Sequence, residues 1–219
     1  MGTDSLQWGK VRMHLLSQIF SLSPEPWLLI LWIIWAAVWL IAALWTAGLK
    51  RLPVEKSEWR LSRLSMIVVL IPGFLLWKEP ALWLHRPLLP AFFVLPGLLI
   101  CGAGIAFSFW ARFALNRNWS GVAVIRSGHE LIERGPYRYV RHPIYSGLLT
   151  SLAGTALAQG LPLRWVGVWL LSLLAVGFKI MGEERLLAER FGKEFKSFRE
   201  STPALFPRPI RRRGQASSP

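Results

Sequence analysis

WLLILWIIWAAVWLIAALWTAG, residues 27–48, is a run of 22 residues without a single charged side chain. As a helix, this run is long enough to cross the roughly 30 Å hydrocarbon core of a bilayer. It exceeds the roughly 7 to 15 apolar residues of a signal peptide, so we expect it to stay in the mature chain. Because 53% of all residues are hydrophobic as well, the sequence predicts an integral membrane protein.

Four more apolar segments follow this first one, at residues 61–77, 88–111, 143–159 and 163–178. The proline and glycines inside 88–111 are tolerated in membrane helices whose neighbours satisfy the backbone. Only Gly160, Leu161 and Pro162 separate the last two segments, which favours a helical hairpin. We predict an all-α membrane protein with about five transmembrane helices, the last two forming a hairpin, followed by a cytoplasmic amphipathic helix.

The basic residues are distributed unevenly between the two sides of these spans. Of the 26 Lys and Arg residues, 21 fall in the loop after the first span, in the loop after the third, or beyond the fifth. Basic loops stay cytoplasmic, so we expect the N-terminus outside and the C-terminus inside. The net charge of +14 then indicates contact with anionic lipid headgroups rather than with nucleic acid. The chain divides into an N-terminal arm (1–26), three helices (27–111), a loop, hairpin and C-terminal helix (112–207), and a basic tail (208–219).

Cysteine and histidine do not indicate a metal site. The lone Cys101 lies inside the third span, where we expect it to pack in the core. The four histidines are scattered and accompany no cysteine cluster, so no metal ligands are predicted. Neither a Walker loop nor a GxGxxG follows a strand pattern, which argues against a standard soluble nucleotide fold.

Residues 135–147, GPYRYVRHPIYSG, place basic side chains at the start of the fourth span. Pro143 suits the first position of a helix, so Arg141 and His142 lie at the positive end of that helix. Such an end binds anions through its unpaired backbone amides. Tyr145 follows three to four residues later and shares a surface with both. The motif predicts an anion-binding site, although a simple cytoplasmic anchor accounts for parts of it.

A second motif, FKIMGEERLLAERFGKEFKSF, covers residues 178–198 at the end of the fifth span. Lys179, Glu183 and Arg190 are spaced to share one helix face. An acidic Glu183 at the membrane boundary is costly without a partner or a ligand. Leucine and phenylalanine spacings of four, four and three predict one amphipathic helix, formed around Leu187, Phe191, Phe195 and Phe198. Its opposite face, with Glu184, Glu189 and Lys193, is expected to be solvated and to carry ordinary ion pairs.

Together, GPYRYVRHPIYSG, EERLLAERFGKEF at 183–195 and TPALFP at 202–207 resemble the isoprenylcysteine carboxyl methyltransferase family and the related phospholipid methyltransferases. The resemblance covers residues 112–207. It implies S-adenosylmethionine as the cofactor, held at the cytoplasmic ends of the last spans, and a lipid-modified substrate that enters from the bilayer. It implies no particular oligomeric state.

The resemblance also assigns residues to this site by position. Asn118, Trp119 and Ser120 resemble the start of a cofactor loop, and Lys179 stands where relatives often carry a substrate-side arginine. Phe195 and Phe198 stand where tyrosines are common. The positions implied to contact the cofactor are Val124, His129, Glu130, Leu131, Ile132, Tyr137, His142, Pro143, Ile144, Tyr145 and Glu183.

The chemistry of the donor suits these side chains. Arg141 and His142 could bind its carboxylate, and Glu183 its amine or ribose hydroxyls. A carboxylate acceptor is ionised near neutral pH and needs no base, so Arg190 or Lys179 would only orient it. An amine acceptor would need deprotonation, with Glu184 the nearest candidate base.

Methyl transfer to a carboxylate is the favoured hypothesis, and transfer to the amine of a phosphatidylethanolamine-like lipid is the first alternative. A membrane reductase that binds NADPH is a second alternative, for which Arg126 and Arg138 could contact the nicotinamide phosphate. A membrane scaffold without activity is the third, and it predicts tolerance of substitution at His142 and Glu183.

Overall fold

The computed structural model describes residues 23–47, 54–57, 87–115, 124–126 and 131–207. The predicted span at 61–77, most of the N-terminal arm and the basic tail lie outside the described residues, as do Asn118 to Ser120, His129 and Glu130.

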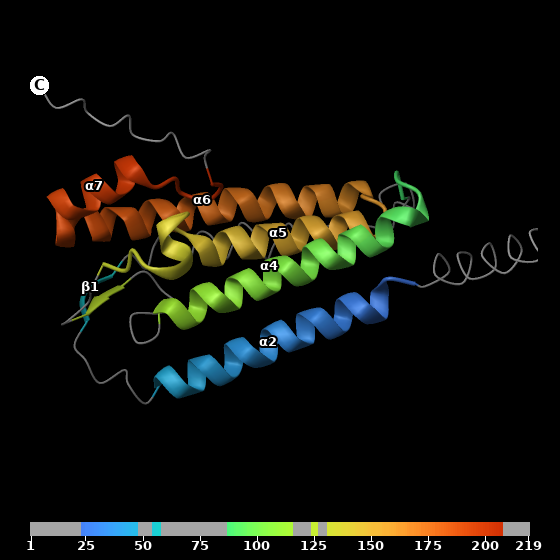
Figure 1. Ribbon diagram of the computed structural model, residues 1–219, viewed down its shortest axis with the longest axis horizontal. Helices are drawn as coiled ribbons and strands as arrows, with labels where there is room; N and C mark the ends of the chain where they lie inside the picture. The colour runs from blue at the N-terminus through green and yellow to red at the C-terminus, as the bar shows by residue number, and fades with distance from the viewer. Residues whose placement is uncertain (1–22, 48–53, 58–86, 116–123, 127–130, 208–219) are drawn as a thin grey trace, which may run out of the picture.

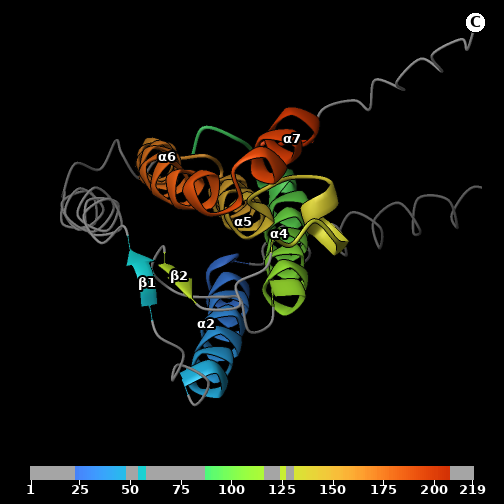
Figure 2. The ribbon, with the colours of Figure 1, turned by 90° about the vertical axis from the view of Figure 1, so that its left-hand side faces the viewer.

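In the described part of the chain, four long helices lie side by side and form a bundle (Figure 1). They are α2 (Glu25–Ala47), α4 (Val94–Leu115), which follows the 3-10 turn η2 (Ala91–Phe93), α5 (Pro143–Ala158) and α6 (Leu163–Phe191). The 3-10 turn η4 (Gly135–Arg138) leads into α5, and a short helix, α7 (Lys193–Ser201), follows α6. Seen along the bundle, α5 lies between α4 and α6, and α2 packs on α4 (Figure 2). The helical membrane architecture and the α5–α6 hairpin are therefore confirmed.

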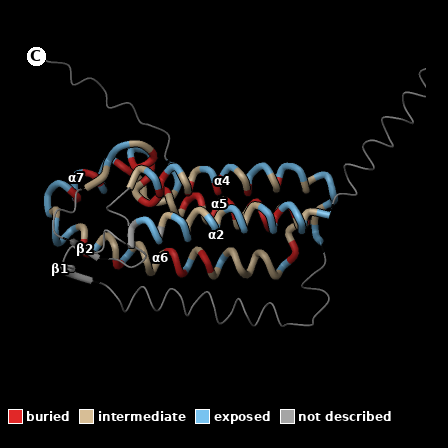
Figure 3. Tube along the Cα trace, turned by 90° about the horizontal axis from the view of Figure 1, so that it is seen from below, coloured by how far each residue is buried: buried red, intermediate tan, exposed pale blue. Residues whose placement is uncertain are grey.

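Among the described residues, three helices are long and apolar enough to cross a membrane: Glu25–Ala42 within α2, Ala91–Leu115 and Leu163–Phe191. Only 6% of the Glu25–Ala42 stretch of α2 is buried inside the protein, and its exposed side chains include Leu29, Ile33 and Leu40. Such an apolar outer surface fits contact with lipid tails. With 16 residues, α5 is shorter than these three, and its many small residues are buried between its neighbours (Figure 3).

Small residues let α4 and α5 approach closely. Gly97, Cys101, Gly104 and Ser108 on α4 face Gly147, Ser151, Gly154 and Ala158 on α5. A Cβ atom on Gly104 would lie 2.6 Å from the Gly147 carbonyl oxygen, and one on Gly154 would lie 2.3 Å from the Cys101 nitrogen. Close backbone approach through small residues is how membrane helices commonly pack. This contact sets where α5 begins relative to the end of α4.

Two features differ from the predicted fold. A short antiparallel ladder pairs β1 (Val54–Ser57) with β2 (Val124–Arg126) and so joins two loops in which no strand was predicted. In addition, α6 continues without a break from the predicted fifth span to Phe191. Gly192, with φ +51°, then ends it. The predicted C-terminal amphipathic helix is present as α7, in which Phe195 and Phe198 are buried, but Leu187 and Phe191, predicted to belong to it, lie on α6.

The ends of α2, α4 and α6 and the start of α5 all lie at one end of the bundle, together with α7 and the β ladder (Figure 1). This is the end to which the sequence assigns most basic residues. The two motifs of the C-terminal half meet there.

Candidate active site

His142 lies between two glutamates at this end of the bundle. It is the residue before Pro143 at the start of α5, and its side chain is 6% exposed. Its Nδ1 lies 3.4 Å from Glu183 Oε2, and its Nε2 lies 3.2 Å from Glu184 Oε1. Because a carboxylate faces each ring nitrogen, the imidazolium form can donate from both. Burial opposes this charge, but the hydrogen bonds and charges of Glu183 and Glu184 outweigh it and raise the pKa of His142.

Arg141, which immediately precedes His142, forms an ion pair with Glu184 on α6. Its Nε and Nη2 donate to Glu184 Oε1 at 2.9 and 2.7 Å. Both side chains are largely buried, with 10% and 16% of their surfaces exposed. The expectation that Glu184 belongs to a solvated face is therefore wrong. Glu183, the preceding residue, was predicted to need a partner or a ligand instead of lying on that face. Glu184 lies in the same cluster as Glu183, because the fold brings Arg141 and His142 next to it.

Two tyrosines complete the cluster around Glu183. The Tyr145 hydroxyl donates to Glu183 Oε1, and the Tyr145 ring stacks on His142 with centroids 5.9 Å apart. Tyr137 is buried in η4. Burial and, after it, the nearby charge of Glu183 hold the pKa of Tyr137 well above its ordinary value. Glu183 keeps 25% of its side chain exposed, so it is the more accessible of the two glutamates.

The segment after α7 covers the start of α5. The backbone amides of Arg141 and His142 donate to the carbonyls of Pro203 and Ala204, at 2.8 and 2.9 Å. Arg141 Nη1 also donates to the carbonyls of Arg199, at 3.1 Å, and of Thr202. The Ser146 hydroxyl lies 2.5 Å from the Leu205 carbonyl oxygen. Sequence reasoning found TPALFP as part of a resemblance but predicted no role for it, nor for Ser146.

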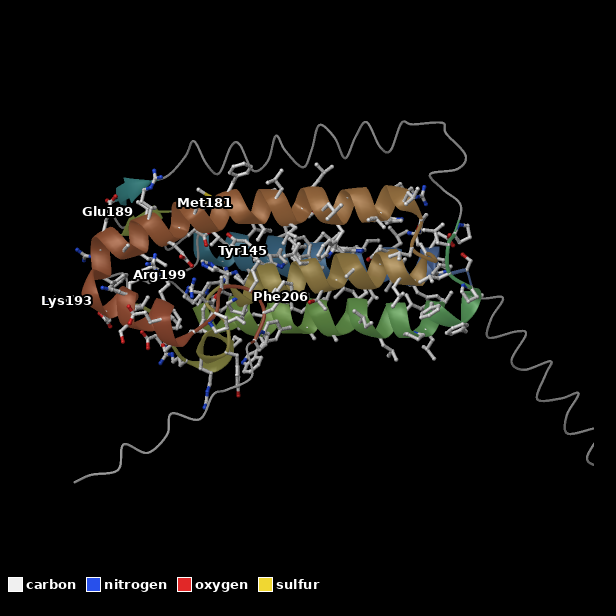
Figure 4. The ribbon with its side chains drawn as sticks, turned by 90° about the horizontal axis from the view of Figure 1, so that it is seen from above. Tyr145, Met181, Glu189, Lys193, Arg199 and Phe206 are labelled. Carbon is white, nitrogen blue, oxygen red and sulfur yellow. The ribbon has the colours of Figure 1, made fainter. Side chains whose placement is uncertain are left out.

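The remaining predicted residues are placed differently. Pro143 and Ile144 begin α5, and Leu131 and Ile132 are half-buried in the segment before η4. The backbone of Val124 lies in β2. Lys179 and Arg190 are both on α6, before and after the cluster, and Arg190 is exposed. In Figure 4 Glu189 and Lys193 lie at the outer end of α6 and α7, away from Tyr145. The roles assigned to all these side chains stay predictions.

Comparisons with known proteins show resemblances to membrane methyltransferases and to metal resistance proteins. The family model for phospholipid methyltransferases matches residues 92–194. A protein-S-isoprenylcysteine O-methyltransferase of Schizosaccharomyces pombe is 34% identical over 36% of this chain and 34% of its own. The solved structure of a eukaryotic intramembrane Ras methyltransferase, an isoprenylcysteine carboxyl methyltransferase, matches with a TM-score of 0.50 at 22% identity. This structural match covers 70% of the present chain and 54% of the solved chain. The resemblance to the isoprenylcysteine carboxyl methyltransferase family is confirmed.

A longer match is to a nickel-cobalt-cadmium resistance protein of Alcaligenes xylosoxydans xylosoxydans, 28% identical over 68% of this chain and 63% of that protein. The chain thus spans from about a third to just under two thirds of the length of these curated relatives. These comparisons show a resemblance to methyltransferases over part of the chain, and the apolar helices indicate an integral membrane protein.

Proposed function

We propose that this protein is a membrane-embedded, S-adenosylmethionine-dependent methyltransferase that transfers a methyl group to a carboxylate of a lipid-like substrate. The observation that carries the proposal is the convergence of both motifs on His142, with Glu183 and Glu184 from α6 against Tyr145 from α5 and Arg141 just before it. These residues are 38 to 43 positions apart in sequence. A cluster of this kind, at the end of a bundle with lipid-exposed helices, suits a charged cofactor beside an apolar substrate.

The residues present fit the proposed cofactor in charge and position. Glu183, with a quarter of its side chain exposed, offers a carboxylate to an ammonium group or to ribose hydroxyls. The first amides of α5 have no carbonyl partner within the helix and can face a carboxylate. When bound, S-adenosylmethionine supplies a methyl group on a sulfonium, which an acceptor atom can displace in line. The contribution of this chain is to bind and orient the two reactants.

The contacts of Glu184 favour a carboxylate acceptor over an amine. Glu184 is the candidate base for an amine, but its Oε1 accepts hydrogen bonds from both Arg141 and His142. Neighbouring cations stabilise the ionised carboxylate and so weaken it as a base. A carboxylate acceptor needs no base, and Lys179 or Arg190 on the same helix would orient it. An aminolipid acceptor remains the second candidate, because the matching family model is that of phospholipid methyltransferases.

Calorimetric titration with S-adenosylhomocysteine, with NADPH titrated in parallel, tests the cofactor. We expect saturable binding of S-adenosylhomocysteine alone, and Glu183→Gln should weaken it roughly tenfold or more, since a hydrogen bond to a charged group is lost. Glu194→Gln, the same charge change at an exposed position on α7, should leave the affinity unchanged. Binding of NADPH alone would indicate a reductase, and binding of neither ligand would contradict the proposal.

The acceptor is tested by the chemistry of the product. Methyl-labelled S-adenosylmethionine would be incubated with the protein and either a prenylcysteine or phosphatidylethanolamine. A methyl ester releases its label in alkali, whereas a methylated amine keeps it. We expect alkali-labile label on the prenylcysteine. Stable label on the aminolipid alone would replace the carboxylate by the amine.

A further inference from the structure

Five carbonyl groups between residues 199 and 205 accept hydrogen bonds from residues at, or just before, the start of α5. Those of Pro203 and Ala204 accept the amides of Arg141 and His142, at 2.8 and 2.9 Å. Those of Arg199 and Thr202 accept from the Arg141 guanidinium. The amides of Arg141 and His142 precede the helix and would otherwise need water or another acceptor. Residues 202–205, here called the C-terminal segment, therefore satisfy the amides of the two residues that precede α5.

Ser146 is the one α5 side chain for which the described residues show a hydrogen bond to this segment. It is buried, and its Oγ lies 2.5 Å from the Leu205 carbonyl oxygen and 3.1 Å from the His142 carbonyl oxygen. A serine hydroxyl has a single hydrogen to donate, so the shorter contact, to Leu205, is the favoured one. Removal of this hydroxyl would leave the part-buried Leu205 carbonyl without this donor.

Ser146 stands one helical turn after His142, on the same face of α5. It attaches the C-terminal segment at its Leu205 end, and the backbone of Arg141 and His142 attaches it at Pro203 and Ala204. The segment thus bridges the first turn of α5. The orientation of the His142 ring between Glu183 and Glu184 depends on the backbone that this bridge fixes.

We propose that Ser146 is a positioning residue of the methyl-donor site, which it serves by holding the C-terminal segment against the backbone of Arg141 and His142. This inference rests on the proposed function. Ser146 itself need not touch the donor. It acts through the segment and through the geometry of the Arg141, His142, Glu183 and Glu184 cluster.

Ser151 offers a matched control on the same helix. It is also buried, and its hydroxyl also donates to a carbonyl four residues earlier, that of Gly147, at 2.8 Å. This hydrogen bond stays within α5 and does not reach the C-terminal segment. Ser146→Ala and Ser151→Ala therefore remove the same group from similar surroundings and differ in the contact to Leu205.

The test measures backbone exchange and donor affinity in both full-length variants. In Ser146→Ala we expect faster hydrogen exchange at the amides of Arg141 and His142 and an affinity for S-adenosylhomocysteine about fivefold weaker, the size of one lost hydrogen bond. Ser151→Ala should match the wild type in both. A thermal unfolding midpoint measured on each variant separates these local effects from a general loss of stability.

Three results would overturn the inference. They are unchanged exchange at Arg141 and His142 in Ser146→Ala, faster exchange with an unchanged donor affinity, or the same changes in Ser151→Ala. A wild-type protein that binds no S-adenosylhomocysteine would instead overturn the proposed function, and the inference with it. The wild-type titration thus distinguishes the two failures.

Discussion

At the scale of single residues, the cluster is built so that each buried charge has a partner. His142 has a carboxylate on each side, and Arg141 pairs with Glu184 through two hydrogen bonds to one oxygen. Breaking a buried pair by removing one partner is costly because the other charge stays buried. Glu184 is consequently tied to Arg141 and His142, whereas Glu183 keeps enough exposure to meet a ligand.

His142 makes the stability of the protein depend on pH. The raised folded-state pKa means that the folded protein binds this proton more tightly than the unfolded chain, in which a histidine titrates near about 6.5. The resulting stability is fully present below the unfolded pKa and is lost as the pH rises through the folded pKa. His142→Gln removes this pH-dependent contribution to the stability of the folded protein. Thermal unfolding measured from about pH 5.5 upward should show the largest gap between wild type and variant at the acid end. A gap that widens with rising pH would contradict the charged histidine.

At the scale of elements, the contact between α4 and α5 and the break after α6 position the site. The small-residue contact lets the start of α5 lie beside the end of α4. Gly192 ends α6 with a positive φ, which glycine adopts without a steric penalty. The chain then turns back through α7, whose Phe195 and Phe198 are buried, and delivers the C-terminal segment to α5.

Gly104 and Gly102, two residues apart on α4, test the helix contact. A Cβ on Gly104 would lie within 2.6 Å of backbone atoms of Gly147 and Ser151, whereas one on Gly102 would meet nothing within 4 Å. Gly104→Ala should therefore destabilise the protein by about 1 to 3 kcal/mol, because helix backbones must move apart. Gly102→Ala should not lower the unfolding midpoint, since alanine favours a helix. Equal midpoints in the two variants would argue against close packing here.

At the scale of the whole molecule, the bundle separates two ends with different chemistry. One end holds the charged cluster, α7 and the β ladder. The other holds the α5–α6 turn, where the Leu88 and Leu89 amides both donate to the Gly160 carbonyl. The sequence assigns the basic loops to the first end, and the positive-inside rule predicts that this end faces the cytosol.

Cysteine labelling in intact cells tests this orientation. Leu88→Cys and Glu194→Cys, both at exposed positions, mark the two ends and would be made in a Cys101→Ser background. An impermeant thiol reagent should label Leu88→Cys in intact cells and Glu194→Cys only after permeabilisation. The reverse pattern would place the site on the outer side of the membrane.

The sequence by itself determined the membrane class, the helical hairpin and the residues around His142, because hydropathy, proline and glycine placement and short motifs are local properties. It also separated Glu183 from the solvated pattern, since a charge at a membrane boundary needs a partner. The three spaced motifs were enough to indicate the family.

Only the tertiary structure decided which side chains pair. Glu184 and Arg141 are 43 positions apart, and Ser146 and Leu205 are 59 apart. Helical spacing shows which residues lie on the same side of one helix. It does not show which side of α5 or α7 packs against them. Hydrophobic periodicity did not predict the pairing of β1 with β2, which depends on contacts between distant segments. It also did not predict the end of α6 at Gly192, which depends on a backbone angle. These elements were missed because long-range hydrogen bonds and a single positive φ follow from packing rather than from local pattern.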